Sequence, residues 1–160
     1  SISTIEEIFT LMLDLLKSND SHYYFSVCWS VAWSGEADIF PESLRLTYVT
    51  YLVNSWIKSN EYNLQRVTSW ALSKILTPSI SKNEIFKIEE LKTTIHKNYQ
   101  NPANEFDKLT SIYLGTIIGE TFDKKELIEL FRLRFRREGA SLYLFADVLG
   151  IKLEEPQIEP

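Results

Sequence analysis

Apolar side chains recur every three or four residues along most of this 160-residue chain, and a polar or proline-containing break interrupts them about every 20 residues. This spacing places the apolar side chains on one face of an α-helix, whereas a half-buried strand needs alternation. The predicted segments begin near residues 4, 22, 42, 62, 82, 103, 124 and 141. We therefore expect an all-α fold, with a single domain of about seven to eight helices in successive antiparallel hairpins over residues 1–150 and an acidic C-terminal tail over residues 151–160.

A helix pair spans about 40 residues, and this period leaves two arrangements open. HEAT and armadillo repeats stack helix pairs of similar length into a solenoid. No residue motif repeats with the period, so an irregular helical bundle is the alternative to a short HEAT-like stack of αα hairpins.

Two helix starts carry the spacing of a capping box. Ser3 is followed by Glu6, and Ser81 is followed by Glu84. In a capping box the two side chains satisfy backbone N–H groups that the helix itself leaves without partners. We expect the second box to open a helix that continues without interruption to Tyr99.

Residues 23–33, Tyr-Tyr-Phe-Ser-Val-Cys-Trp-Ser-Val-Ala-Trp, are the most apolar and aromatic stretch, and we expect the other helices to pack around them. Large and small side chains alternate as in a strand, yet Phe25, Cys28 and Trp29 also share one helix face. No other segment alternates in this way, so a strand here would lack a partner for its backbone. We favour a buried helix that Gly35 stops and that places Trp29 in the core, with a strand as the alternative.

Composition disfavours several classes of protein. Cys28 is the only cysteine, which rules out an internal disulfide and a CxxC redox or zinc site. With 22 acidic and 17 basic residues, the net charge of −5 disfavours a nucleic-acid partner, because phosphate binding depends on Lys and Arg. No run of about 18 apolar residues predicts a membrane span. Glu6 and Glu7 stand where a secretory signal would be positively charged, so we expect a cytoplasmic protein that binds no membrane.

Catalytic and metal sites lack their usual residue combinations. His22 and His96 are the only histidines, and neither has a carboxylate or a second histidine at the spacing of a helical metal site. Cys28 lies in the most apolar stretch, where a thiol is typically inert. Glu126 and Glu129 lie one turn apart, a pattern typical of a solvated helix face. We predict that the chain is not an enzyme and that it carries no cofactor and no metal.

The segment expected to form a helix over residues 124–139 contains four arginines, namely Arg132, Arg134, Arg136 and Arg137. On a helical wheel they disperse, and Arg134 falls among the leucine and phenylalanine side chains of the apolar face. Glu138 lies four residues further on the same face. The pattern favours an i, i+4 ion pair in which the arginine stem packs on the core and the head reaches water. An interhelical polar site or an anchor for a partner is the alternative.

No Lys or Arg occurs between Ser18 and Leu44. Acidic and aromatic residues gather in the second half of this interval: Trp33, Glu36, Asp38, Phe40 and Glu42. Uncompensated carboxylates attract a basic protein over a long range, and aromatic side chains supply the anchors of many interfaces. We predict that these five residues form part of a partner-binding surface. The alternative is a solvated loop whose acids favour the following helix start.

In size, charge and aromatic content the whole chain resembles the small, acidic, cytoplasmic immunity proteins with which bacteria neutralise their own secreted toxins, including those of contact-dependent inhibition systems. The resemblance implies a stoichiometric inhibitor that covers the active site of a basic, nuclease-like toxin domain. It assigns a role to no single residue, because these proteins vary widely in sequence. Two other classes remain open: a helical scaffold or adaptor that holds a peptide or helix of a larger complex, and a helical enzyme or small-ligand-binding domain. The sequence leaves the oligomeric state open.

Overall fold

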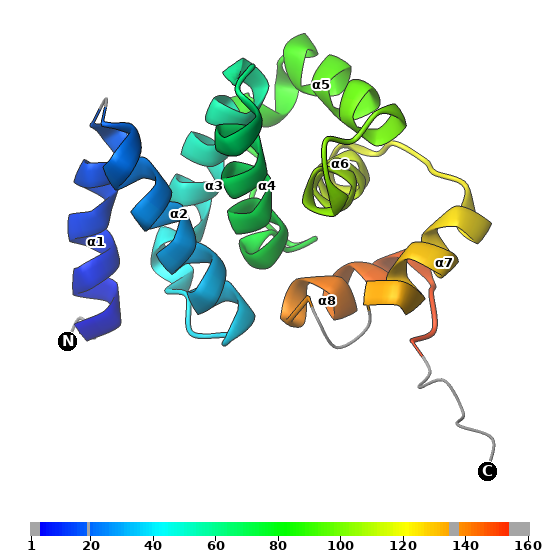
Figure 1. Cartoon of the computed structure of the whole chain (residues 1–160). Coiled ribbons are helices and arrows are strands. Elements are labelled where there is room, and N and C mark those ends of the chain that lie inside the picture. The colour runs from blue at the N-terminus through cyan, green and yellow to red at the C-terminus, as the bar shows by residue number, and fades with distance from the viewer. Residues whose placement is uncertain (1–3, 19, 135–137, 154–160) are drawn as a thin grey trace.

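The computed structural model describes residues 4–18, 20–134 and 138–153. These residues form eight α-helices and one short 3₁₀ helix, with no strand among them (Figure 1). The all-α prediction is confirmed, and residues 23–33 are helical. The elements are α1 (Thr4–Lys17), α2 (Ser21–Glu36), α3 (Glu42–Lys58), α4 (Tyr62–Ile75), the 3₁₀ helix η1 (Glu84–Lys87), α5 (Glu89–Gln100), α6 (Glu105–Ile118), α7 (Lys124–Arg134) and α8 (Ala140–Leu149).

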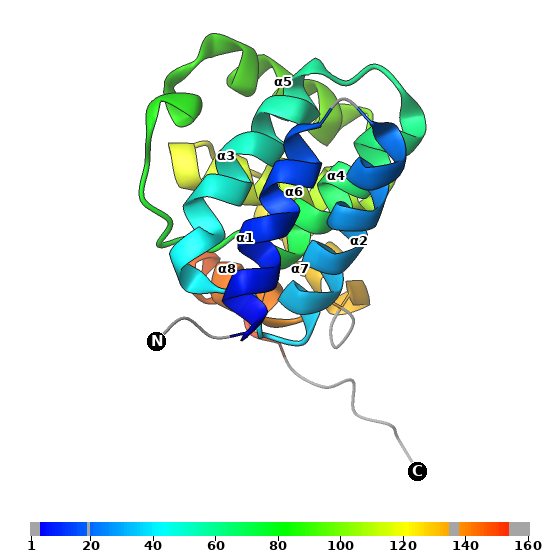
Figure 2. The same cartoon turned by 90° about the vertical axis from the view of Figure 1, so that its left-hand side faces the viewer.

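The first six helices form a short stack of hairpins in two layers. The two helices within each of the pairs α1–α2, α3–α4 and α5–α6 pack against each other. The even-numbered helices α2, α4 and α6 lie side by side in one layer, and α1, α3 and α5 form the other (Figure 1). Figure 2 shows α1 in front of α2 and α3 and between them. Of the two arrangements that the sequence leaves open, the structure has the stacked one from α1 to α6.

The helix at the centre of the fold is α4. It packs against α2, α3, α6 and α8. Thr68, Ser69 and Ser73 are buried in it, and each hydroxyl donates a hydrogen bond to a carbonyl of its own helix, at 2.6, 3.1 and 2.8 Å. These small, internally satisfied side chains let several helices approach α4 at once. The expectation that residues 23–33 form the centre is therefore wrong, since they lie in α2, which packs chiefly on α4.

Polar side chains fix the starts of the three even-numbered helices. Asp20, Glu61 and Asn104 each accept one or two hydrogen bonds from the backbone N–H groups at the first turn of α2, α4 and α6. These N–H groups have no partner within the helix, so each cap stabilises the start by about 1 kcal/mol. At the other end of α6, Gly119 takes the left-handed conformation (φ 91°) that ends the helix.

The predicted fifth helix, expected to start near residue 82 and to run to Tyr99, is split in two. Asn83, rather than Ser81, accepts a hydrogen bond from the backbone N–H two residues further on, at 3.1 Å, and starts η1. Ile88 is then extended (φ −78°, ψ 139°), and α5 begins only at Glu89. Asparagine competes well for backbone groups in such turns, which explains why a capping-box spacing alone misplaces the helix start.

Some predicted ends lie outside the described residues. Ser3 of the first capping box is one, and residues 135–137 of the helix expected to end at Gly139 are others. Of the tail predicted over residues 151–160, only residues 151–153 are described, and Ile151 is buried against the core. Among the described helices, none combines the length and the apolarity that crossing a bilayer requires.

Candidate functional site

The helices α2 and α4 cross with their backbones almost in contact. A Cβ atom added to Gly35 would lie 2.5 Å from the carbonyl oxygen of Lys74. The helix continues past Gly35 to Glu36, so the prediction that this glycine stops the helix is wrong. Gly35 instead permits the close crossing, because any larger residue would push the two helices apart.

Small side chains form the buried face of α2. Val27, Cys28 and Val31 are completely buried against the neighbouring helices. Trp29 is 52% exposed and Trp33 is 56% exposed. The prediction that Trp29 lies in the core is therefore wrong. The reason is the close crossing, which leaves room between α2 and α4 for small side chains only and turns the large ones outward.

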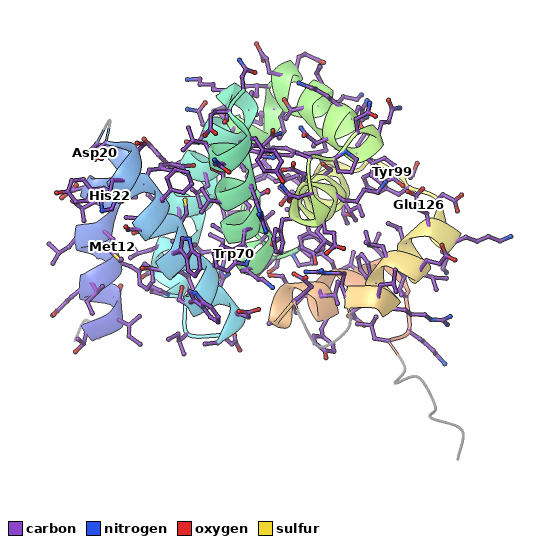
Figure 3. All side chains as sticks on the ribbon, in the orientation of Figure 1. Met12, Asp20, His22, Trp70, Tyr99 and Glu126 are labelled. Atoms are coloured by element: carbon purple, nitrogen blue, oxygen red, sulfur yellow. The ribbon has the colours of Figure 1, made fainter. Side chains whose placement is uncertain are left out.

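Three tryptophans, Trp29 and Trp33 on α2 and Trp70 on α4, form what we call the tryptophan cluster (Trp70 is labelled in Figure 3). The Trp70 ring stands edge-on to both others, with centroid distances of 4.9 Å to Trp29 and 6.1 Å to Trp33. The centroids of Trp29 and Trp33 are 6.4 Å apart. Edge-to-face pairs at these distances stabilise each other beyond simple area burial. The half-buried Trp70 therefore holds two solvent-exposed indoles in fixed positions.

A hollow of about 510 Å³ opens beside the tryptophan cluster. Its lining comes from α2, α4 and α6, so it lies on the same layer of helices as the cluster: Phe25, Trp29, Asn63, Arg66, Val67, Trp70 and Phe106. The Phe106 ring lies 6.2 Å from that of Trp70 and extends the row of aromatic side chains onto α6. Pockets for small ligands have volumes of roughly 300–1,000 Å³, so this hollow is large enough for one.

A chain of ion pairs joins this face to the C-terminal helices. The Lys74 Nζ atom lies 3.2 Å from Glu36 Oε1 and 2.8 Å from Glu138 Oε2, and the Lys74 and Glu138 side chains are 2% and 0% exposed. Arg134 pairs with Glu138, the i, i+4 contact expected from the sequence, and also with Glu105 on α6. Its head is mostly covered rather than in water. Lys74 thus brings together the two places that the sequence marks separately, the acidic end of α2 and the Arg134–Glu138 pair.

Three of the five residues predicted to meet a partner are exposed, namely Trp33, Asp38 and Glu42. Trp33 belongs to the tryptophan cluster. Asp38 has a left-handed backbone (φ 57°), which aspartate tolerates better than most residues do. Glu42 is in the first turn of α3 and pairs with Arg45 at 2.7 Å. These side chains remain available to a second molecule.

Phe40 and Glu36 are covered instead. Phe40 is only 6% exposed, because its ring packs edge-on against Phe9 and Tyr48 at centroid distances of 5.1 and 5.3 Å. This corrects the expectation that Phe40 anchors a partner, since it belongs to the core between α1 and α3. Glu36 is partly covered, because its carboxylate is held by Lys74.

Trp70, Lys74 and Phe106 complete the site, although no motif marks them in the sequence. Trp70 offers one usable signal, since it lies beside, rather than within, the apolar stripe of its helix, which comprises Leu64, Val67, Ala71, Leu72 and Ile75. A large aromatic side chain in such a place often contacts another surface. Lys74 has no comparable signal, because its partners are far away in the sequence.

Cys28 and Tyr24 carry reactive groups that are covered by the packing of the helices. Burial raises the pKa of the Cys28 thiol to about 12, so the thiol stays protonated at neutral pH and is a poor nucleophile. Burial also raises the pKa of Tyr24, whose hydroxyl shares a hydrogen bond with Thr68 at the floor of a second hollow of about 540 Å³. No group of three or more His, Cys, Asp or Glu side chains in the described residues is placed to hold a metal ion.

No family model, curated protein or solved structure matches this chain. Its function is therefore inferred from the tryptophan cluster, the hollow beside it and the ion pairs around Lys74.

Proposed function

We propose that this chain is a non-enzymatic protein-binding module that binds a basic protein through the tryptophan cluster. The observation that carries the proposal is the exposure of Trp29 and Trp33, which are 52% and 56% exposed and lie one turn apart on α2. Tryptophan is among the residue types most enriched in interface hot spots. An indole already held by edge-to-face contacts also loses little conformational freedom on binding.

Acidic side chains that follow the tryptophan cluster in the chain favour a basic partner. Asp38 follows Trp33 and is exposed, whereas Glu36 and Glu105 already pair with Lys74 and Arg134. A lysine or arginine of the partner can stack on an exposed indole, and a second basic side chain of the partner can pair with Asp38. The net charge of −5 adds long-range attraction for such a partner.

Among basic partners, we propose first a nuclease-like toxin domain, with this chain as its immunity protein. The chain resembles immunity proteins in size, acidity and aromatic content, and this resemblance supports the choice. The surface chemistry adds a second reason. A nucleic-acid-binding site recognises the negative charge of a polynucleotide and the bases that stack on its side chains. Carboxylates together with exposed aromatic rings present both features.

A helical scaffold or adaptor is the second candidate, and the stacked hairpins favour it. The hollow crosses α2, α4 and α6, so a peptide or helix lying in it would contact three helices of one layer. The two candidates differ in selectivity. An immunity protein binds one partner tightly, whereas an adaptor tolerates several weaker ligands.

Affinity capture with matched variants tests the proposal. The bait is the native protein, the double variant Trp29→Ala, Trp33→Ala, or the control Leu133→Ala, which removes another exposed apolar side chain on α7. We expect a protein of high isoelectric point to be captured by the native and control baits and lost from the double variant, whose helicity is checked by circular dichroism. Capture of an acidic partner, or equal capture by all three baits, would contradict the proposal.

Growth assays then distinguish the two candidates. If the captured protein is a toxin, its production alone arrests growth, and co-production of this chain restores growth. Co-production of the double variant should restore growth less well. A captured protein that is harmless by itself favours the adaptor instead.

A further inference from the structure

We propose that the hollow beside the tryptophan cluster is a binding site for a small organic anion that carries a flat aromatic ring. This goes beyond the proposed function, because the ligand is a small molecule that binds inside the hollow. Trp29 belongs to both surfaces, since it lines the hollow and is one of the two exposed indoles proposed to meet the protein partner. The volume of about 510 Å³ suits a molecule of one or two fused rings with a charged substituent.

The walls of the hollow are suited to a flat ring. Phe25, Trp29, Trp70 and Phe106 come from three helices that are already packed together. The Trp29 and Trp70 rings are nearly perpendicular, at 86°, and the Trp70 and Phe106 rings are tilted by 40°. A ring that enters the hollow can therefore stack on one indole while its edge meets another. The aromatic walls need little rearrangement to bind it.

Arg66 sets the charge of the ligand. It lines the hollow, is exposed, and has no carboxylate partner among the described residues, whereas Arg45 and Arg134 are both paired with glutamates. No Asp or Glu is among the described residues that line the hollow. An unpaired guanidinium beside an apolar cavity offers two parallel N–H donors to a carboxylate, sulfonate or phosphate.

The second polar side chain of the lining supports the same choice. Asn63 lies three residues before Arg66 on α4, one turn away, so its amide can donate a hydrogen bond to the same anion. Aromatic walls alone would also suit an ammonium ligand through cation–π contacts. The positive charge of Arg66 disfavours that ligand.

Isothermal titration calorimetry with two probes of the same shape tests the charge preference. The probes are 2-naphthoate, which is an anion, and 2-naphthamide, which is neutral. We expect the native protein to bind 2-naphthoate at one site and 2-naphthamide at least about tenfold more weakly, as expected for loss of a charged hydrogen bond. No saturable binding of 2-naphthoate, or equal affinity for both probes, would overturn the proposal.

Matched variants locate the site. Arg66→Gln should weaken 2-naphthoate binding about tenfold and leave 2-naphthamide binding unchanged. Arg132→Gln is the control, since it removes the same charge from an exposed arginine on α7 that does not line the hollow. Trp29→Ala should weaken both probes, because it removes a wall. Equal weakening by the two arginine variants, or full binding by Trp29→Ala, would show that the probes bind elsewhere and would overturn the assignment.

Discussion

Lys74 carries its positive charge where almost no water reaches it, between the carboxylates of Glu36 and Glu138. A buried charge without a partner costs several kcal/mol of solvation, so each member of this group depends on the others. The Arg134–Glu138 contact is visible in the sequence, because four residues separate its members. Lys74 is 64 residues from Glu138, and no local pattern can reveal that pair.

Replacing Lys74 by methionine should lower the free energy of unfolding by about 3 kcal/mol, because Glu138 stays buried and, among the described residues, keeps only Arg134 as an ion-pair partner. Lys87→Met is the matched control. It removes the same charge and also breaks an ion pair, with Glu84, but both of those side chains are exposed. The control should cost less than about 1 kcal/mol. Urea unfolding followed by circular dichroism measures both values, and similar losses in the two variants would refute the importance of the buried group.

At the scale of the elements, the crossing of α2 and α4 decides which side chains face outward. Gly35→Ala should destabilise the fold by about 1–3 kcal/mol, because its new methyl group meets the backbone of Lys74. The emission of the tryptophan cluster should change as well, since its rings belong to the two helices that are pushed apart. Ser26→Ala, at an exposed position of α2, should change stability by less than about 0.5 kcal/mol. Urea unfolding of both variants tests this, and an equal response would mean that the crossing is not tight.

A second connection ties α5, α6 and α7 together (Figure 3 labels two of its residues, Tyr99 and Glu126). The Tyr99 hydroxyl donates to one carboxylate oxygen of Glu126 at 2.9 Å, and Lys108 Nζ donates to the other at 2.7 Å. The bond from Lys108 first, and that from Tyr99 second, lower the pKa of Glu126. Glu126 is therefore more than the solvated helix residue that its spacing from Glu129 indicates.

The pH dependence of stability should report this connection. Because the folded-state pKa of Glu126 lies below the unfolded value, its contribution is fully present above the unfolded pKa and is lost as the pH falls through the folded pKa. Glu126→Gln should cost up to about 1 kcal/mol at neutral pH, a small value because the site is exposed, and nothing at strongly acidic pH. Glu129→Gln, at an exposed position of the same helix, is the control and should change the free energy of unfolding at neutral pH by less than about 0.5 kcal/mol. Thermal unfolding across this pH range measures both.

The helices could be predicted from the sequence where their signals are local. The apolar stripe of α4 and the acidic starts of several helices are of this kind. The buried face of α2 could not be predicted, because apolar side chains surround that helix and its periodicity favours no single face. Its orientation depends on Gly35 against Lys74, a contact between distant parts of the chain. Trp29 lies at the surface and Phe40 lies in the core, the reverse of what the sequence predicts. Phe40 is placed by Phe9, which is also far away in the sequence.

For the whole molecule, the layer of even-numbered helices carries the tryptophan cluster and the hollow, and the exposed Asp38 follows the end of α2. Such an arrangement should direct a basic partner toward this face by long-range attraction before any contact forms. The acidic groups should then act mainly on the association rate, and the indoles on the dissociation rate.

Asp38→Asn combined with Glu42→Gln should slow association with a basic partner several-fold at low salt and less at moderate salt, with unchanged helicity. Glu36 is left in place because it pairs with Lys74. The control is Glu84→Gln with Glu89→Gln, which removes the same net charge from exposed positions in η1 and α5. Stopped-flow measurements at two salt concentrations give the rates. If both double variants slow association equally, net charge alone attracts the partner.

The two faces of α2 have a consequence for how this protein can change over generations. The close crossing confines Val27, Cys28 and Val31, so substitutions at these positions lower the stability of the fold. Trp29 and Trp33 face water, so they can be exchanged with little effect on the core. A lineage under pressure to recognise a new partner can therefore alter the outward positions of this one helix while its scaffold stays the same. Those positions are also where a library for selecting new binding specificities should be placed.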